Sequence, residues 1–167
     1  MGRYFSPGEV SLAGVAFQNA EQLAFRHFRV RPEGEKRFRY DVKTRAYLDH
    51  HEVREGAFAH LCKYEYGNGY FYRICLQDDQ IIDAVTRAHS FIKFSPLMLY
   101  IAAHELVHVI RFDRGEADFD VSANEKVDEE MRVHSITGDM LQACMNPDLR
   151  LVMECFSNRY NLGEVLC

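Results

Sequence analysis

Apolar positions are densest in one stretch of the chain, Leu97–Phe112, which opens with an unbroken apolar run from Leu97 to Ala103. A run of this kind without glycine or internal proline favours a helix that is buried on most sides. Serine as N-cap followed by proline at the first helical position is typical of a helix start. The pattern therefore predicts a central buried helix that begins at Ser95 and Pro96.

The segments before residue 60 carry weaker signals. Apolar residues recur at helical spacing within Ser11–Val30, which predicts an amphipathic helix ended by Arg31–Gly34. Between Glu35 and Ala59 the pattern fits one face of a helix, although Phe38–Val42 also alternates as a strand would; we favour the helix. Asp49–Glu52 contains two adjacent histidines, whose side chains point in different directions on a regular element, so we expect a polar loop there.

The segment Phe58–Leu76 predicts a β-hairpin. Aromatic and β-branched residues flank the turn Gly67–Gly69 on both sides, and this arrangement is a strong hairpin signal. Asp78 and Asp79 then predict the start of a helix, because acidic side chains favour the positive end of the helix dipole. The hairpin and this helix thus precede the buried helix.

The C-terminal third of the chain predicts two further helices. Asp113–Asp120 is polar and without periodicity, which indicates a loop. Ser122 is a suitable N-cap for a long helix that runs to about Met145 and is stopped by Pro147. A last helix is expected over Asp148–Arg159.

Length and composition place these elements in one globular domain. The chain has 167 residues, of which 47% are hydrophobic and 27% charged. We therefore expect a single α+β domain over residues 1–167, mostly helical, with a small β-hairpin or sheet upstream of the buried helix. The net charge of −5 argues against nucleic acid as a partner, and no apolar run is long enough for a membrane span. Five cysteines without CxxC spacing favour a reducing, cytoplasmic compartment.

Candidate chemistry lies inside the buried helix, at His104, Glu105 and His108. Histidines four residues apart lie one above the other on a helix, so both imidazoles can bind one metal ion. Glu105 projects to the flank of this face, from which it can reach a water molecule at the metal. The simplest alternative is a buried helix whose histidines hydrogen-bond to the backbone. Burying two imidazoles and a carboxylate together is costly, however, and a metal ion compensates for that cost.

A third protein ligand is expected from the helix after Ser122, because a catalytic zinc normally has three. The candidates on this helix are Glu125, Asp128, Glu129, Glu130 and His134. Its apolar side is marked by Val127, Met131, Leu141 and Met145. Glu130 and His134 share that side, whereas Glu125 and Glu129 lie on another. Since a ligand must point where the helix packs, we favour Glu130 and keep His134 as the alternative.

These residues give the sequence a resemblance to the zincin metallopeptidases, and within them to the gluzincins. The resemblance covers about Ser95–Leu141 and rests on the motif His104–His108 and a glutamate on a second helix. In gluzincins an acid commonly follows the ligand glutamate by one turn, and small residues come a further turn on. If Glu130 is the ligand, the residue one turn later is His134, which departs from the acid of the family pattern. The residues a further turn on are small, as the family pattern requires. From Glu125 the acid is present but the small residues are missing.

The resemblance implies a zinc-dependent peptidase that acts on peptides or proteins. Zinc would be held by His104, His108 and Glu130, with His134 as a neighbour of the ligands or as the third ligand itself. Glu105 would be the general base. An edge strand usually holds the substrate in this family, and the candidates for it within Tyr70–Leu76 are Tyr70, Tyr72 and Ile74. The candidates for an oxyanion-stabilising residue are Tyr100, His134 and Tyr160, each of which also suits a packing role.

Two other classes of function remain open. One is a zinc-binding module with the zincin fold but without activity, against which the presence of Glu105 argues. The other is a di-iron carboxylate protein that uses Glu105 and His108 as one ExxH element. It requires a second such element, but Glu130 and His134 are separated by one residue too many.

Overall fold

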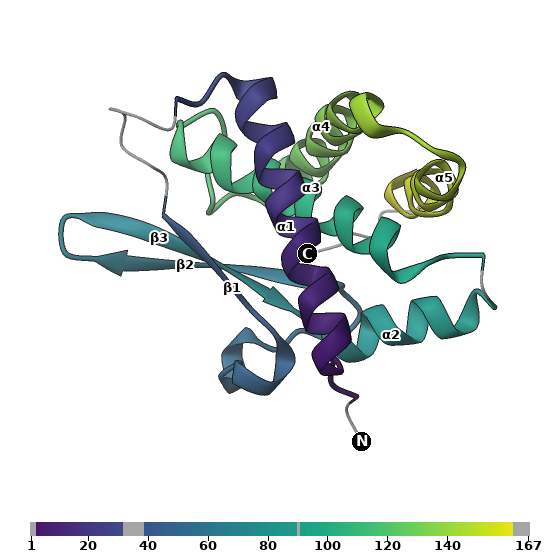
Figure 1. The fold of residues 1–167 in the computed structure, drawn as a ribbon. Coiled ribbons are helices and arrows are strands. Elements are labelled where there is room, and N and C mark those ends of the chain that lie inside the picture. The colour runs from purple at the N-terminus through teal and green to yellow at the C-terminus, as the bar shows by residue number, and fades with distance from the viewer. Residues whose placement is uncertain (1–2, 32–38, 90, 162–167) are drawn as a thin grey trace.

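The structure is a computed structural model that describes residues 3–31, 39–89 and 91–161, with side chains described as far as Phe156. Its helices are α1 (Pro7–Phe28), α2 (Asp78–Arg87), α3 (Phe94–Asp113), α4 (Ala123–Leu141) and α5 (Pro147–Asn161). Its strands are β1 (Tyr40–Lys43), β2 (Ala59–Tyr66) and β3 (Gly69–Leu76). Short 3-10 turns occupy Arg45–Tyr47, His50–Glu52 and Gln142–Cys144. The predicted fold class, α+β and mostly helical, is confirmed (Figure 1).

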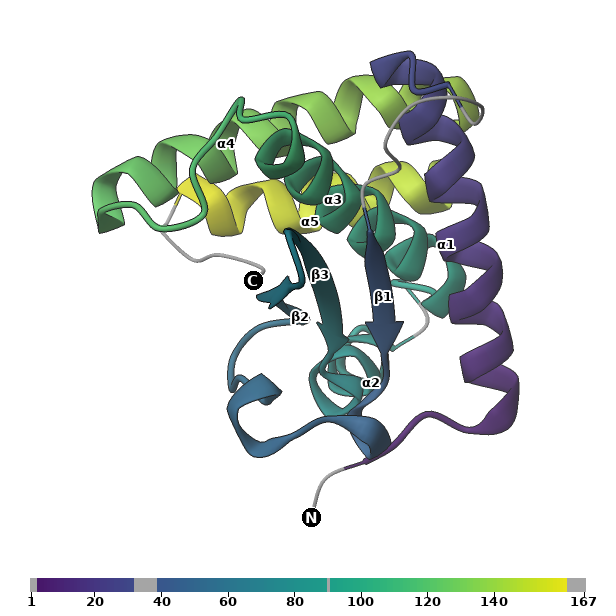
Figure 2. The ribbon, with the colours of Figure 1, turned by 90° about the vertical axis from the view of Figure 1, so that its left-hand side faces the viewer.

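Helix α3 is the centre of the fold. It contacts α1, α2, α4, α5 and β2, and between Leu97 and Arg111 every residue except Leu99 is buried. Figure 2 shows α1 along one side of α3 and the sheet, while α4 crosses α3. This long apolar helix, buried by elements from both ends of the chain, contributes more residues to the hydrophobic core than any other element.

The start of α3 differs from the prediction. The helix begins at Phe94 with Lys93 as its N-cap, so Ser95 lies inside the first turn. The side chain of Lys93 forms an ion pair with Asp148, at 3.2 Å between Nζ and Oδ2, which connects this helix end to α5. Pro96 is still tolerated because backbone N–H groups of the first turn have no partner within the helix.

The sheet has the strand order β1-β3-β2, with β1 parallel and β2 antiparallel to β3. The helix favoured for residues 35–59 is therefore wrong where the structure describes the chain, and residues 32–38 lie outside the described part. Tyr40 and Val42 pack against the core from β1, and Val42 is paired with Ile74. Pairing with a strand some thirty residues later in the chain decides the conformation of this short segment. The local pattern of apolar residues gives no sign of that pairing.

The strand proposed as the substrate-binding edge is not at an edge. Tyr70, Tyr72 and Ile74 belong to β3, which is hydrogen-bonded on both sides. Tyr72 is 3% exposed and Ile74 is fully buried, whereas Tyr70 lies near the hairpin turn and is half exposed. The error follows from the unrecognised strand β1, and β2 is one of the two edge strands.

The helix boundaries elsewhere follow local chemistry. In α1 the hydroxyl of Ser6 accepts from the backbone of Glu9, whose side chain accepts in return, so the helix starts earlier than predicted. Ser122 caps α4 as predicted and accepts from the backbone N–H of Glu125. The α-helix ends at Leu141, before the predicted end near Met145. The 3-10 turn Gln142–Cys144 continues the helical chain up to that point.

The segment Asp49–Glu52, predicted to be a polar loop, places a carboxylate in the interior. Glu52 is fully buried, accepts a hydrogen bond from the hydroxyl of Tyr64 and forms an ion pair with Arg73 at 3.1 Å. It also accepts from the backbone N–H of Asp49 at 2.8 Å. Burial alone would raise the pKa of Glu52, but these three partners lower it below its usual range.

Acid is therefore expected to destabilise the wild type through Glu52. A carboxyl whose pKa is lowered in the folded state stabilises the fold above about pH 4.3, the unfolded value, and loses this contribution as pH falls through the folded pKa. At pH 7 Glu52→Gln should cost about 1–3 kcal/mol of unfolding free energy. Urea unfolding of both proteins at a series of pH values measures this difference in unfolding free energy. The difference should shrink as pH falls below about 4. Glu65→Gln, at an exposed position of β2, should show neither effect.

Candidate metal centre

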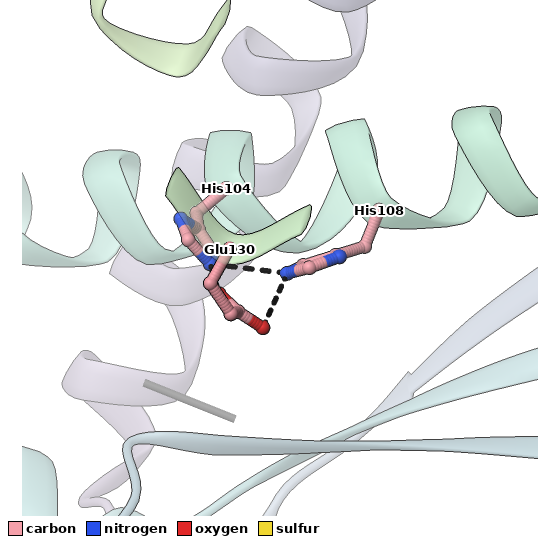
Figure 3. A group of neighbouring side chains, drawn as sticks. All are labelled: His104, His108 and Glu130. Carbon is pink, nitrogen blue, oxygen red and sulfur yellow. Dashed lines mark hydrogen bonds and ion pairs between the residues drawn. The ribbon is translucent and has the colours of Figure 1, made fainter. Parts of the chain in front are cut away.

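Two consecutive turns of α3 carry the histidine pair. Figure 3 shows the imidazoles of His104 and His108 directed from α3 toward one another and toward Glu130. Their Nε2 atoms lie 3.2 Å apart, and the two residues are 0% and 3% exposed. Glu105 is buried beside them. The structure thus brings the two imidazoles together as the spacing predicted.

Helix α4 adds a carboxylate to this pair. One oxygen of Glu130, Oε2, lies 3.1 Å from Nε2 of His104, and the other, Oε1, lies 3.0 Å from Nε2 of His108. Glu130 is itself 7% exposed. Each of the three residues offers one ligand atom, and these atoms all lie within 4.8 Å of one another. This group of two nitrogens and one carboxylate is the candidate metal centre.

The other ligand candidates on α4 lie elsewhere. Glu125 and Asp128 are exposed, Glu129 forms an ion pair with an arginine of α3, and His134 is hydrogen-bonded to a tyrosine of α3. The side of α4 predicted to be apolar is partly wrong, since Val127 is 38% and Met131 is 54% exposed. The buried side runs instead through Glu130, Val133, Thr137, Met140 and Leu141.

Two polar contacts join α3 to α4 on either side of the centre. The hydroxyl of Tyr100 and Nδ1 of His134 are hydrogen-bonded at 2.9 Å, one turn before the histidine pair. About one turn after the pair, Arg111 donates to both carboxylate oxygens of Glu129, at 2.6 and 2.9 Å. The two contacts fix the register of antiparallel helices around the centre. Sequence reasoning missed Arg111, although a lone cation within an apolar helix is a signal for a buried partner.

Replacing Arg111 is expected to destabilise the fold strongly. In Arg111→Met the carboxylate of Glu129 stays mostly buried without its partner, which should cost about 3 kcal/mol of unfolding free energy in urea titrations. Arg132→Met is the matched control, because Arg132 lies 3.6 Å from the same carboxylate but its side chain is 59% exposed. That variant should stay within about 0.5 kcal/mol of wild type. Equal losses in both variants would contradict a special role for Arg111.

The charges at the centre are strongly coupled. Burial lowers the pKa of His104 to about 4, although Glu130 acts in the opposite direction. Burial also lowers the pKa of His108, but the neighbouring carboxylate of Glu130 outweighs it and raises the pKa. Burial would raise the pKa of Glu130, but the two histidines hold it well below its usual range. The carboxylate is therefore ionised, and a bound cation would compete with protons for the imidazole nitrogens.

A cleft of about 220 Å³ reaches the centre from the surface. Its lining includes two of the three donors, His108 and Glu130. The aromatic ring of Phe112 stacks on the imidazole of His108, with 5.7 Å between ring centroids, and Phe119 meets Phe112 edge-on. The opposite wall comes from β2, through His60 and Leu61. The cleft thus gives a solvent-exposed path to the donors, bordered by aromatic rings and an edge strand.

The donor set fits a zinc ion. Two histidines and one glutamate are a ligand combination of catalytic zinc sites, which keep a fourth position for water. Ligand atoms at about 2.0–2.1 Å from a tetrahedral ion lie about 3.3 Å from one another. The two imidazole nitrogens lie 3.2 Å apart, close to this value, and each lies 3.0–3.1 Å from a different oxygen of Glu130. Two donors face the cleft, where a fourth position would be open.

The predicted oxyanion candidates do not line this cleft among the described residues. Tyr100 is fully buried, and its hydroxyl is engaged with His134, so both residues serve the contact between α3 and α4. The side chain of Tyr160 lies outside the described residues. His60 of β2 and Arg54, which precedes β2, also line the cleft and supply polar groups that sequence reasoning did not single out.

Comparison of the chain with protein-family models, with curated proteins and with solved structures finds no match. Among the described residues, no helix combines the length and apolarity that a membrane crossing requires. The resemblance to gluzincins therefore depends on the motif His104–His108 and on the position of Glu130 alone.

Proposed function

We propose that the protein is a zinc-dependent metallopeptidase in which Glu105 is the general base. The observation that carries this proposal is the meeting of His104, His108 and Glu130 from two helices at the end of an open cleft. A purely structural zinc site is normally closed by four protein ligands, whereas this group has three.

The residues of the centre divide the chemistry among them. His104, His108 and Glu130 would hold zinc, which when bound lowers the pKa of water toward about 7 and polarises a carbonyl group. Glu105 lies close enough to the centre for its charge to contribute to the raised pKa of His108. In this position its carboxylate would take a proton from water and transfer it to the leaving amine.

Strand β2 is the proposed binding edge for an extended peptide. It is an edge strand of the sheet, and His60 and Leu61 line the cleft from it. A peptide that adds to this edge through backbone hydrogen bonds would run past His108 and Glu130. This assignment replaces the one made for Tyr70–Leu76 from the sequence.

The second candidate is a zinc-binding module without hydrolytic activity. It is favoured by the position of Glu105, which is 1% exposed and is not among the residues that line the cleft. The di-iron alternative is disfavoured, because Glu105 does not belong to the group of potential ligands and Met131 is exposed on α4.

Metal content and cleavage measured together test the proposal. Elemental analysis of the purified protein should give one zinc per chain, and an unfolded protein substrate should be cleaved. A chelator should abolish cleavage, and added zinc should restore it. One zinc without cleavage would identify the inactive module, two irons the di-iron protein, and no metal a buried helix with hydrogen-bonded histidines.

A further inference from the structure

A second group of reactive side chains lies on the paired strands β2 and β3. Side chains alternate along a strand, so His60 and Cys62 of β2 share one face while Leu61 points to the core. On β3 the direct partners of these two residues are Cys75 and Arg73. The pairing therefore gathers two thiols, an imidazole and a guanidinium on four neighbouring positions. None of these residues is a candidate metal ligand, although His60 also lines the cleft.

Within this group Cys62 is the accessible thiol. It is half-buried, whereas Cys75 is fully buried. Its Sγ lies 3.9 Å from Nδ1 of His60, and the thiol of Cys75, which faces His60 on β3, is a second neighbour that lowers its pKa. A neighbouring imidazole stabilises a negative sulfur, and a thiolate stabilised in this way is the reactive form of cysteine.

The other charges around Cys62 largely compensate one another. Arg73 is paired with Asp41 and with Glu52, so the carboxylate nearest the thiols is partly neutralised. Other ionisable groups near this pair of strands are Lys43 opposite Cys75, Tyr64 on β2 and Arg54 near His60. The cleft that His60 lines also carries Asp118, Asp120, Lys126, Glu129 and Glu130. Burial and Glu52 oppose a thiolate, but the neighbouring Cys75 and His60 outweigh them and lower the pKa of Cys62 to about 5. The contact with Cys62 in turn raises the pKa of His60.

We propose that Cys62 is a modification site that reacts as a thiolate with soft electrophiles, and that peroxides are the oxidants it takes. With hydrogen peroxide the sulfur attacks one oxygen, an S–O bond forms and the O–O bond breaks. Sulfur is oxidised to the sulfenic acid while peroxide is reduced to hydroxide, which an acid of the buffer protonates to water. His60 and Cys75 are positioning residues in this step. The proposal does not depend on a metal at the other site.

The exposed Cys144 serves as an internal reference, because its thiol is not activated. The buried part of its side chain raises its pKa, which disfavours the thiolate. At pH 6 an ordinary thiol has roughly one part in several hundred as thiolate, whereas Cys62 is mostly ionised. The lower basicity of its sulfur removes about 1.5 powers of ten of this advantage. A net rate advantage of roughly tenfold should therefore remain for Cys62.

Alkylation of the intact protein with iodoacetamide, mapped by peptide mass spectrometry, tests this. At pH 6 Cys62 should be labelled about tenfold faster than Cys144, and hydrogen peroxide followed by dimedone should mark Cys62 first. His60→Asn should raise the pH midpoint for labelling of Cys62, with circular dichroism as the check on folding. Faster labelling of Cys144 at pH 6, or a midpoint for Cys62 near pH 8.5, would overturn the proposal.

The midpoint can also be measured without a histidine variant. The ultraviolet absorbance of the thiolate, taken as the difference between wild type and Cys62→Ser, should titrate near pH 5. Cys75→Ala should move this midpoint upward, because the neighbouring thiol that lowers the pKa of Cys62 is lost. A difference spectrum that titrates only above pH 8, or a midpoint unchanged in Cys75→Ala, would count against the arrangement.

Discussion

Glu105→Gln is expected to lower peptide hydrolysis by about 10²–10⁴-fold while leaving one zinc per chain. Glutamine has nearly the shape of glutamate but cannot accept the proton, so the reaction loses its base. Because His104, His108 and Glu130 are untouched, zinc content should not change. The measurements are kcat/KM on a quenched fluorescent peptide and elemental analysis of the same sample.

Glu125→Gln is the matched control, since Glu125 is an exposed glutamate at the start of α4. This variant should keep full activity and full zinc content. A Glu105→Gln variant that retains a tenth or more of wild-type activity would refute the assignment of the base. Loss of zinc from that variant would instead make Glu105 a ligand.

The histidine pair could be predicted from the sequence because its geometry is local. The positions i and i+4 of a helix are neighbours whatever surrounds it, and the apolar run before His104 makes the helix buried. The hairpin was predictable for the same reason, since Gly67–Gly69 sets the turn between strands that are adjacent in the chain.

The sheet order could not be predicted in this way. Strand β1 has only four residues, and its partner β3 begins after two 3-10 turns and a further strand. A parallel strand leaves no turn signal, so its existence depends on long-range pairing such as that of Val42 with Ile74. Missing β1 made β3 seem to be an edge strand, and the edge available to a substrate was misplaced as a consequence.

The packed side of α4 shows a different limit. Its apolar residues Val127 and Met131 suggested one side, whereas the buried side is turned from it and contains Thr137 and a carboxylate. Polar residues such as Glu130 enter the interior because partners on α3 satisfy them, and a single helix does not reveal its partners. Burial of Glu129 against Arg111 is a second case of the same kind.

Replacement of the carboxylate that joins the histidines should have the largest effect on metal binding. Glu130→Gln is expected to weaken zinc binding by more than about a hundredfold, because even partners outside the ligand shell contribute 10- to 100-fold. The variant should also lose the rise in melting temperature that zinc gives to wild type. At zinc concentrations near 100 times the wild-type Kd, that stabilisation corresponds to about 2.7 kcal/mol.

His134→Asn decides between the two predicted third ligands. His134 lies one turn from Glu130 on the same helix, but its Nδ1 is engaged by Tyr100, so this variant should bind zinc within about tenfold of wild type. Zinc affinity is measured by competition with a chromophoric chelator, and melting curves with and without zinc give an independent value. The reverse pattern, in which Glu130→Gln keeps zinc and His134→Asn loses it, would make His134 the ligand. In that case α4 would have to turn about its axis when the metal binds, because Glu130 occupies the position beside both imidazoles.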